Sequence, residues 1–131
     1  MLMVDSGGIP LSAYTHSAGF SEVHGIETLI DERCLPRVPD HLLYDKAADS
    51  NDLRDALEAR GVELVCPHRR GRKNKRQDGR AMRRFWRRFV VERSISSLQN
   101  FRRLVVRYEY YERLFEGFLH LACAFTILKS F

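Results

Sequence analysis

Residues 41–66 read HLLYDKAADSNDLRDALEARGVELVC, and this stretch decides the fold. It begins with a short apolar run, His41 to Tyr44, that ends at Asp45, as in a buried strand whose C-terminal end presents a side chain. It ends with a second strand, Val62 to Cys66. A strand, a helix and a strand in close succession predict a parallel pair joined by a right-handed crossover. The chain is therefore expected to belong to the α/β class.

The middle of this stretch has the pattern of a helix. Asp49 or Ser50 can cap its beginning, Leu53 and Leu57 share one face, and Gly61 can stop it. An alternative for Asp45 itself is a turn or capping role, because an Asp that follows a strand often has one.

The chain begins with the pattern of a β-hairpin. Met1 to Val4 and Ile9 to Tyr14 read as strands, and Asp5 with Ser6-Gly7-Gly8 as the turn between them. A short helix is expected from about Glu22 to Glu32, before the two prolines that follow it.

Two helical regions are expected after the second strand, from about Arg80 to Leu98 and from about Arg103 to Leu128. The second carries enough apolar residues at mixed three- and four-residue spacing to pack on a sheet: Leu104, Tyr108, Tyr111, Phe115, Phe118, Leu119, Ala122 and Phe125. For Phe85, Trp86 and Tyr108, core packing is the preferred interpretation and stacking on unpaired bases is the alternative.

Positive charge is concentrated in residues 69–107, which hold thirteen arginines and two lysines against Asp78 and Glu92. The remainder of the chain is acidic, so the formal net charge of +5 conceals a polarised molecule. Such a density of guanidinium groups indicates a surface that meets nucleic-acid phosphates. Residues 68–79 contain no apolar side chain and are expected to form a mobile basic loop. The candidate DNA-binding residues are Arg69, Arg70, Arg72, Lys73, Lys75, Arg80, Arg83, Arg84, Arg87, Arg93, Arg102 and Arg103.

Glu92 is the candidate acid within this basic stretch. On a continuous helix it would lie near Phe85 and Phe89 on the apolar face, where a buried carboxylate needs a cation partner. A salt bridge to Arg88, Arg93 or another arginine is one such partner. The other is a divalent cation such as Mg²⁺, shared with Asp45.

The class of protein is bounded by length and composition. A chain of 131 residues fits one domain. The three cysteines are far apart and contain no CxxC pair, so we expect three small buried hydrophobic residues in a cytoplasmic protein. The longest apolar run, from Gly117 to Leu128, is too short to cross a bilayer.

Several segments together resemble the DDE transposases of bacterial insertion sequences. The run FVVERSISSLQNFRRLVVRYE, residues 89–109, resembles the C-terminal signature of that family. Further matching segments occur in the same order as in the family: 4–11, 44–50, 64–69 and 118–124. The chain departs from the family pattern at Ala48, where the family has Tyr, and at Ser97, where it has Trp.

The resemblance implies a partial RNase H-like fold: a hairpin, parallel strands with a crossover helix, and long C-terminal helices. Three acids would bind two Mg²⁺ ions for DNA strand cleavage and transfer. Asp45 matches the second catalytic and metal-binding acid and Glu92 the third. The first lies upstream of the segment that matches Met1, and Asp5 does not occupy its position.

Residues 1–131 are therefore expected to form a single incomplete transposase domain, a C-terminal fragment that is inactive alone and binds Mg²⁺ weakly or not at all. Its expected partners are double-stranded DNA at insertion-sequence ends and further transposase subunits, with no membrane. The alternative function is a non-catalytic fragment that binds DNA or a transposase. Composition alone also permits a small RNA-binding protein.

Overall fold

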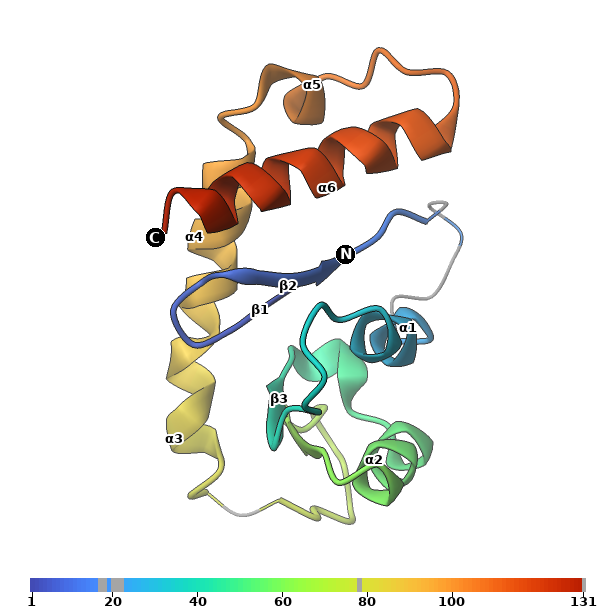
Figure 1. Ribbon diagram of the computed structural model, residues 1–131. Coiled ribbons are helices and arrows are strands. Elements are labelled where there is room, and N and C mark those ends of the chain that lie inside the picture. The colour runs from blue at the N-terminus through green and yellow to red at the C-terminus, as the bar shows by residue number, and fades with distance from the viewer. Residues whose placement is uncertain (17–18, 20–22, 78, 131) are drawn as a thin grey trace. The chain divides into compact units, whose positions relative to one another are not determined.

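The computed structural model describes residues 1–16, 19, 23–77 and 79–130. It divides into two compact units, one formed by Met1–Cys34 and Phe89–Phe131 and the other by Leu35–Arg88. The predicted α/β class is confirmed, because both units combine a two-stranded sheet with helices (Figure 1). The finer prediction, an RNase H-like arrangement, stays a prediction. Among the described residues, no helix is both long and apolar enough to cross a membrane.

The first unit begins with the predicted hairpin. Strands β1 (Leu2–Val4) and β2 (Pro10–Ala13) pair antiparallel, with Met3 opposite Ser12. Asp5 closes the turn, since its Oδ1 accepts hydrogen bonds from the backbone N–H groups of Gly7 and Ile9, both at 2.8 Å. This is the local side-chain-to-backbone bonding that makes Asp frequent in turns.

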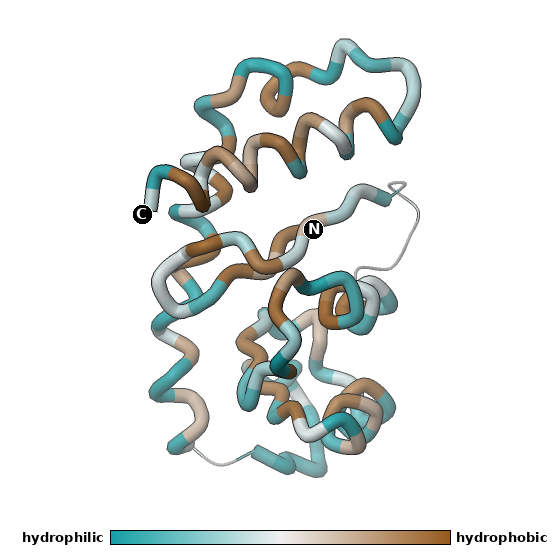
Figure 2. The backbone as a smooth tube through the Cα atoms, in the orientation of Figure 1, coloured by the Kyte–Doolittle hydropathy of each residue, from teal (hydrophilic) through white to brown (hydrophobic). Residues whose placement is uncertain are grey.

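Helices pack around the hairpin. Helix α1 (Gly25–Asp31) buries Ile26 and Ile30, and lies within the predicted span 22–32, of which residue 22 is outside the described residues. Helix α4 (Phe89–Leu98) contacts β1, and α6 (Glu112–Leu128) contacts β2 (Figure 1). Their shared core contains Ala13, Leu98, Ala122 and Cys123, with Leu2, Phe101, Leu104 and Leu119 packed against it. The tube in Figure 2 shows the corresponding apolar stretches along the hairpin and α6.

The second unit contains the predicted parallel pair. Strand β3 (His41–Leu43) lies beside β4 (Glu63–Val65), and α2 (Asn51–Ala59) connects them after a short 3₁₀ turn, η1 (Lys46–Ala48). Leu57, Val62 and Val65 are completely or almost completely buried. Burying each such side chain stabilises the unit by about 1.5–3 kcal/mol relative to leaving it exposed. Gly61 follows Arg60, the C-terminal cap of α2, and its φ of +76° suits a residue without a Cβ.

The long helix predicted from Arg80 to Leu98 is not continuous. It consists of α3 (Met82–Phe85), a 3₁₀ turn η2 (Trp86–Arg88) and α4. A 3₁₀ turn advances about 120° per residue instead of 100°, so positions before and after it do not keep the register of one helical wheel.

The second predicted helical region is also interrupted. A single turn, α5 (Arg102–Val105), is followed by non-helical residues 106–111 before α6 begins. The prediction that Tyr108 and Tyr111 pack against a sheet is therefore wrong. Both side chains are exposed. Trp86 is 82% exposed, so the preferred interpretation of core packing is wrong for this residue too. Cys34 is exposed as well, whereas Cys66 and Cys123 are buried as expected.

The hairpin turn approaches α4 closely at Gly8. Its φ is +94°, its carbonyl oxygen accepts a hydrogen bond from the Ser94 hydroxyl at 2.8 Å, and a Cβ at this position would lie 2.8 Å from Ser94 Oγ. Gly8→Ala therefore combines backbone strain with a steric clash. We expect a loss of about 2–3 kcal/mol in the free energy of unfolding, measured by urea denaturation.

Gly61→Ala is the matched control, because Gly61 also has a positive φ but its Cβ would meet open space. It should cost only the backbone strain, about 1–2 kcal/mol. If both variants lost the same free energy of unfolding, the close approach of Gly8 to α4 would not contribute to stability.

Candidate functional site

Asp45 lies just beyond the C-terminal end of β3, as predicted. Tyr44 continues the ladder by donating its backbone N–H to the carbonyl of Val65, and Asp45 then begins η1. The Asp45 Oδ1 accepts a hydrogen bond from the backbone N–H of Ala47 at 2.8 Å. The capping role considered for this residue is thus observed. It uses one carboxylate oxygen, so it is compatible with a cation at the other.

Glu92 lies in the first turn of α4 and is exposed. The buried face of this helix consists of Val90, Ser94 and Leu98, while Phe89 is 57% exposed. The expectation that Glu92 is buried on an apolar face is therefore wrong, because η2 shifts the register and Phe89 is not a core residue. The carboxylate consequently needs no cation to offset burial, and its exposure leaves it accessible to ions.

The two candidate acids belong to different compact units, Asp45 to residues 35–88 and Glu92 to residues 89–131. Their sharing of one cation therefore stays a prediction. Within residues 1–16, 19, 23–77 and 79–130, no three His, Cys, Asp or Glu side chains come together as metal ligands. The donor chemistry of these two carboxylates nonetheless fits Mg²⁺, which takes hard oxygen ligands from one or two carboxylates and from substrate phosphates.

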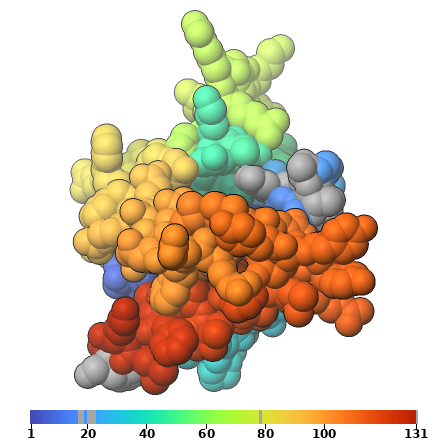
Figure 3. Space-filling model, turned by 90° about the horizontal axis from the view of Figure 1, so that it is seen from above, coloured from blue at the N-terminus to red at the C-terminus, as the bar shows by residue number. Residues whose placement is uncertain are grey.

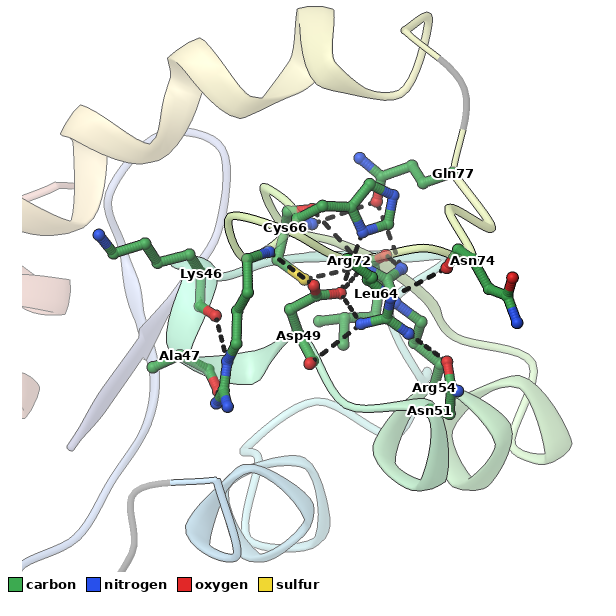
Figure 4. A network of polar contacts seen from close by, with 12 residues as sticks. Lys46, Ala47, Asp49, Asn51, Arg54, Leu64, Cys66, Arg72, Asn74 and Gln77 are labelled. Atoms are coloured by element: carbon green, nitrogen blue, oxygen red, sulfur yellow. Dashed lines mark hydrogen bonds and ion pairs between the residues drawn. The ribbon is translucent and has the colours of Figure 1, made fainter.

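The most densely connected acid is Asp49, not Asp45 (Figure 4). Its side chain is completely buried and lies at the end of η1. Arg54 Nη2 donates to its Oδ1 at 3.2 Å, and the backbone N–H of Arg69 donates to its Oδ2 at 2.8 Å. His68 Nδ1 lies 3.1 Å from Oδ1, and the guanidinium of Arg72 forms an ion pair with the same oxygen. One carboxylate thus ties α2 to the chain that follows β4.

Arg54 is the buried cation of this network, with its side chain only 9% exposed. Besides Asp49, it donates from Nη1 to the carbonyl of Leu64 at 2.8 Å and to Gln77 Oε1 at 3.3 Å, and Nη2 lies 2.9 Å from the Cys66 Sγ. Burial raises the pKa of the Cys66 thiol, so this sulfur is a neutral partner. A buried guanidinium requires this number of partners, because each unmade hydrogen bond in the interior is costly.

Sequence reasoning missed this network. Of the two predicted caps of α2, Asp49 and Ser50, it is Ser50 that occupies the cap position, without a side-chain cap bond. The Asp49 carboxylate binds the arginines and His68 instead. The available signal was the excess of arginine after β4, since a run of guanidinium groups next to a buried segment needs a carboxylate partner.

The network fixes several residues of the basic segment 68–77. Arg72 is 14% exposed at its side chain and also donates to the carbonyls of Asp49 and Asn74, both at 3.0 Å. Arg69 donates to the carbonyl of Ala47 at 2.7 Å. These two candidate DNA-binding residues therefore direct much of their hydrogen bonding inward, whereas Arg70, Lys73 and Lys75 are exposed. The mobility of this loop stays a prediction.

The other candidate DNA-binding residues are divided between the units. Arg83 and Arg87 are exposed beside Trp86, and Arg84 Nη1 lies 3.8 Å from Glu63 Oε2. In the first unit Arg93 lies over the Phe89 ring at 5.6 Å. Arg80 and Arg102 are exposed, while Arg103 pairs with Glu109.

Protonation of Asp49 should unfold the second unit. Burial alone would raise the pKa of this carboxyl, but hydrogen bonds from Arg72, the Arg69 backbone, His68 and Arg54 outweigh burial and hold the pKa well below its ordinary range. The resulting stabilisation is complete above the unfolded-state pKa of about 4 and is lost as the pH falls below it. Asp49→Asn should cost about 3 kcal/mol or more at pH 7, measured by urea denaturation, because it leaves buried cations unpaired.

The same variant should flatten the decline of stability between pH 5 and pH 3, since it removes the titrating group. Asp52→Asn is the matched control, because Asp52 is an exposed acid in the first turn of the adjacent helix α2. If the two variants lost equal stability at pH 7, the buried network would not be a stabilising element.

Comparison with known proteins gives two matches. The family described as Transposase DDE domain matches residues 1–127. A protein of Burkholderia cepacia that is named as a transposase for insertion sequence element IS402 is 32% identical over 130 residues, covering 93% of this chain and 58% of the relative. No solved structure matches the chain. The chain thus spans little more than half the length of this relative.

Proposed function

Since the chain belongs to the family of insertion-sequence transposases with a DDE domain, we propose that it contributes the second and third acids, Asp45 and Glu92, to metal-dependent cleavage and transfer of DNA strands. The observation that carries this proposal is the family match, which extends over both residues. Asp45 at the end of a parallel strand and Glu92 on an exposed helical turn are accessible carboxylates of the type that such chemistry requires.

Asp45 and Glu92 match the second and third acids of the family's triad. We therefore assign activity to the assembled protein in which the first acid is also present. There, Asp45 and Glu92 would hold divalent cations of the Mg²⁺ type, which stabilise the attacking and leaving oxygens of a phosphodiester. The contribution of this chain is to present two anionic ligands and to neutralise the phosphates of the bound DNA.

The phosphate contacts are assigned to basic side chains that are exposed. Arg83 and Arg87 are the principal pair, since both belong to the short helical segment that precedes α4. Arg70, Lys73, Lys75, Arg93 and Arg102 are further exposed members of the set. Arginine suits this role because its planar fork can donate two parallel hydrogen bonds to a phosphate.

Replacing Arg83 and Arg87 together by Gln should weaken binding to duplex DNA and make it less dependent on salt. Each phosphate contact contributes about −0.9 to the slope of log K against log salt, so the slope should become shallower by about 2. The slope is measured by fluorescence anisotropy of a labelled duplex at several salt concentrations.

The control variant combines Arg37→Gln with Lys129→Gln, which removes the same charge from exposed positions outside residues 69–107. Its slope should equal that of the wild-type protein. Equal slopes for both double variants and the wild type would exclude a specific phosphate surface at Arg83 and Arg87.

Strand cleavage can be tested in a chimera in which the N-terminal part of the Burkholderia cepacia relative precedes Met1, with DNA carrying the ends of that relative's element. We expect cleavage that requires Mg²⁺. Asp45→Asn and Glu92→Gln should each reduce it by more than the roughly 10- to 100-fold that loss of an outer-shell metal partner costs.

Glu112→Gln is the matched control, because Glu112 is also an exposed acid in the first turn of a helix. It should leave cleavage unchanged. Duplex binding by the chimera without any cleavage, or cleavage indifferent to Glu92, would instead support the non-catalytic function, in which the chain only binds DNA or another transposase subunit.

A further inference from the structure

The segment between α5 and α6 is held against the first unit from its inner side. Phe101 and Leu104 pack on the core, and the Phe101 ring stacks on Phe125 with centroids 6.4 Å apart. Val106 and Tyr111 have extended backbone conformations at the two ends of the stretch between the helices.

Two arginines of α5 and the segment after it contact aromatic rings of α6. Arg103 Nη1 donates to Glu109 Oε1 at 2.6 Å, and its guanidinium lies 4.8 Å from the centroid of the Phe118 ring. Arg107 donates from Nε to the carbonyl of Glu109 at 3.2 Å and lies 5.6 Å from the Phe115 ring. The Glu109 side chain is only 5% exposed, and its hydrogen bond with Arg103 lowers the pKa of its carboxyl. These contacts fix the backbone of residues 106–110 without using its tyrosines.

Three tyrosine rings of the segment are exposed to solvent. Tyr108 is 75% exposed, Tyr110 90% and Tyr111 68%. Tyr110 and Tyr111 meet edge to face with centroids 5.3 Å apart, which leaves ring faces open to a ligand. In Figure 3 the orange atoms of this segment form a continuous surface beside the red atoms of α6. An exposed aromatic group of this size on a fixed backbone contributes nothing to the core, which points to a ligand.

The chemistry of the surrounding side chains favours one class of ligand. Residues 102–113 contain four arginines and two glutamates, and one of the glutamates is already paired with Arg103. Arg102 and Arg113 are exposed. Flat rings beside guanidinium groups suit a ligand with planar faces and negative charge, as in single-stranded nucleic acid.

We propose that Tyr108, Tyr110 and Tyr111 form a stacking surface for unpaired bases of DNA, with Arg102 and Arg113 as phosphate partners. The proposal rests on the proposed function, since it names the form of DNA that one part of the chain takes. The two sets of residues then have different roles. Arg83 and Arg87 contact the backbone of the duplex, and the three tyrosines bind bases that have left the duplex.

The test compares three labelled DNAs of equal length: a single strand, the same strand with its bases removed at consecutive positions, and a duplex. Binding is measured by fluorescence anisotropy with the full chain. The wild-type protein should bind the intact strand more tightly than the abasic strand. The triple variant Tyr108→Ser, Tyr110→Ser, Tyr111→Ser should bind the intact strand at least about tenfold more weakly and leave duplex affinity within about twofold, because loss of base stacking affects only unpaired bases.

The matched control replaces the same three residues by Phe, which retains the rings and removes the hydroxyl groups. It should bind the intact strand within about threefold of the wild type. If the triple variant melts at a lower temperature, the single variant Tyr110→Ser keeps the test valid, since Tyr110 is the most exposed of the three. Its affinity for the intact strand should fall about fivefold.

Two results would overturn the stacking surface while leaving the proposed function intact. The first is equal affinity of the wild-type protein for the intact and the abasic strand. The second is wild-type affinity of the serine variants for both of these strands, with duplex binding that keeps its salt dependence. Unchanged DNA binding together with loss of self-association in sedimentation velocity would assign the tyrosines to a protein interface instead. Failure of the wild type to bind any of the three DNAs would contradict both proposals.

Discussion

The second unit depends on one buried carboxylate. Asp49 has no exposed side-chain surface, and its partners come from α2, from the residues after β4 and from the backbone of Arg69. Removing a single partner from such a group leaves an uncompensated charge in the interior, whereas the complete set pins the crossover helix to the strand that follows it. The parallel pair β3 and β4 is only three residues long in each strand, so this network supplies cross-links that such a short ladder lacks. Because Asp45 precedes Asp49 by one turn of η1, the buried acid also orients the candidate catalytic acid.

The basic residues of the chain consequently occur in two environments that the sequence alone does not distinguish, a buried network and the exposed surface. Arg54 and Arg72 neutralise Asp49 and are largely inaccessible, while Arg83 and Arg87 are exposed. Because Arg72 belongs to the buried network, a count of arginines in residues 69–107 overstates the positive charge that is exposed. The distinction follows from packing: a guanidinium that already donates to several protein acceptors must break those bonds before it can bind a phosphate.

Local chemistry in the sequence predicted the elements with short-range causes. The hairpin follows from Asp5 and the glycines of its turn, and the strand–helix–strand unit follows from apolar runs bounded by Gly61 and Asp45. The errors arose where long-range packing decides the outcome. Counting 100° per residue placed Glu92 among core residues, but the 3₁₀ turn η2 changed the register and exposed it. Trp86, Tyr108 and Tyr111 were interpreted as core residues because large aromatic side chains usually are, although no sequence rule specifies which aromatic residues remain at the surface. For the candidate site, the family resemblance identified Asp45 and Glu92, whereas the Asp49 network depends on a fold that brings residues 49, 54 and 72 together.

The hydrogen bond between Ser94 and the Gly8 carbonyl joins residues that are 86 positions apart in the sequence. Ser94 lies on the buried face of α4, two residues beyond Glu92, so the hairpin and the beginning of this helix form one mechanical piece. The backbone that carries the Glu92 side chain is thus anchored to the N-terminal turn through Ser94. A distortion of the turn at Gly8 would therefore be felt at the position of Glu92, the candidate acid of this helix.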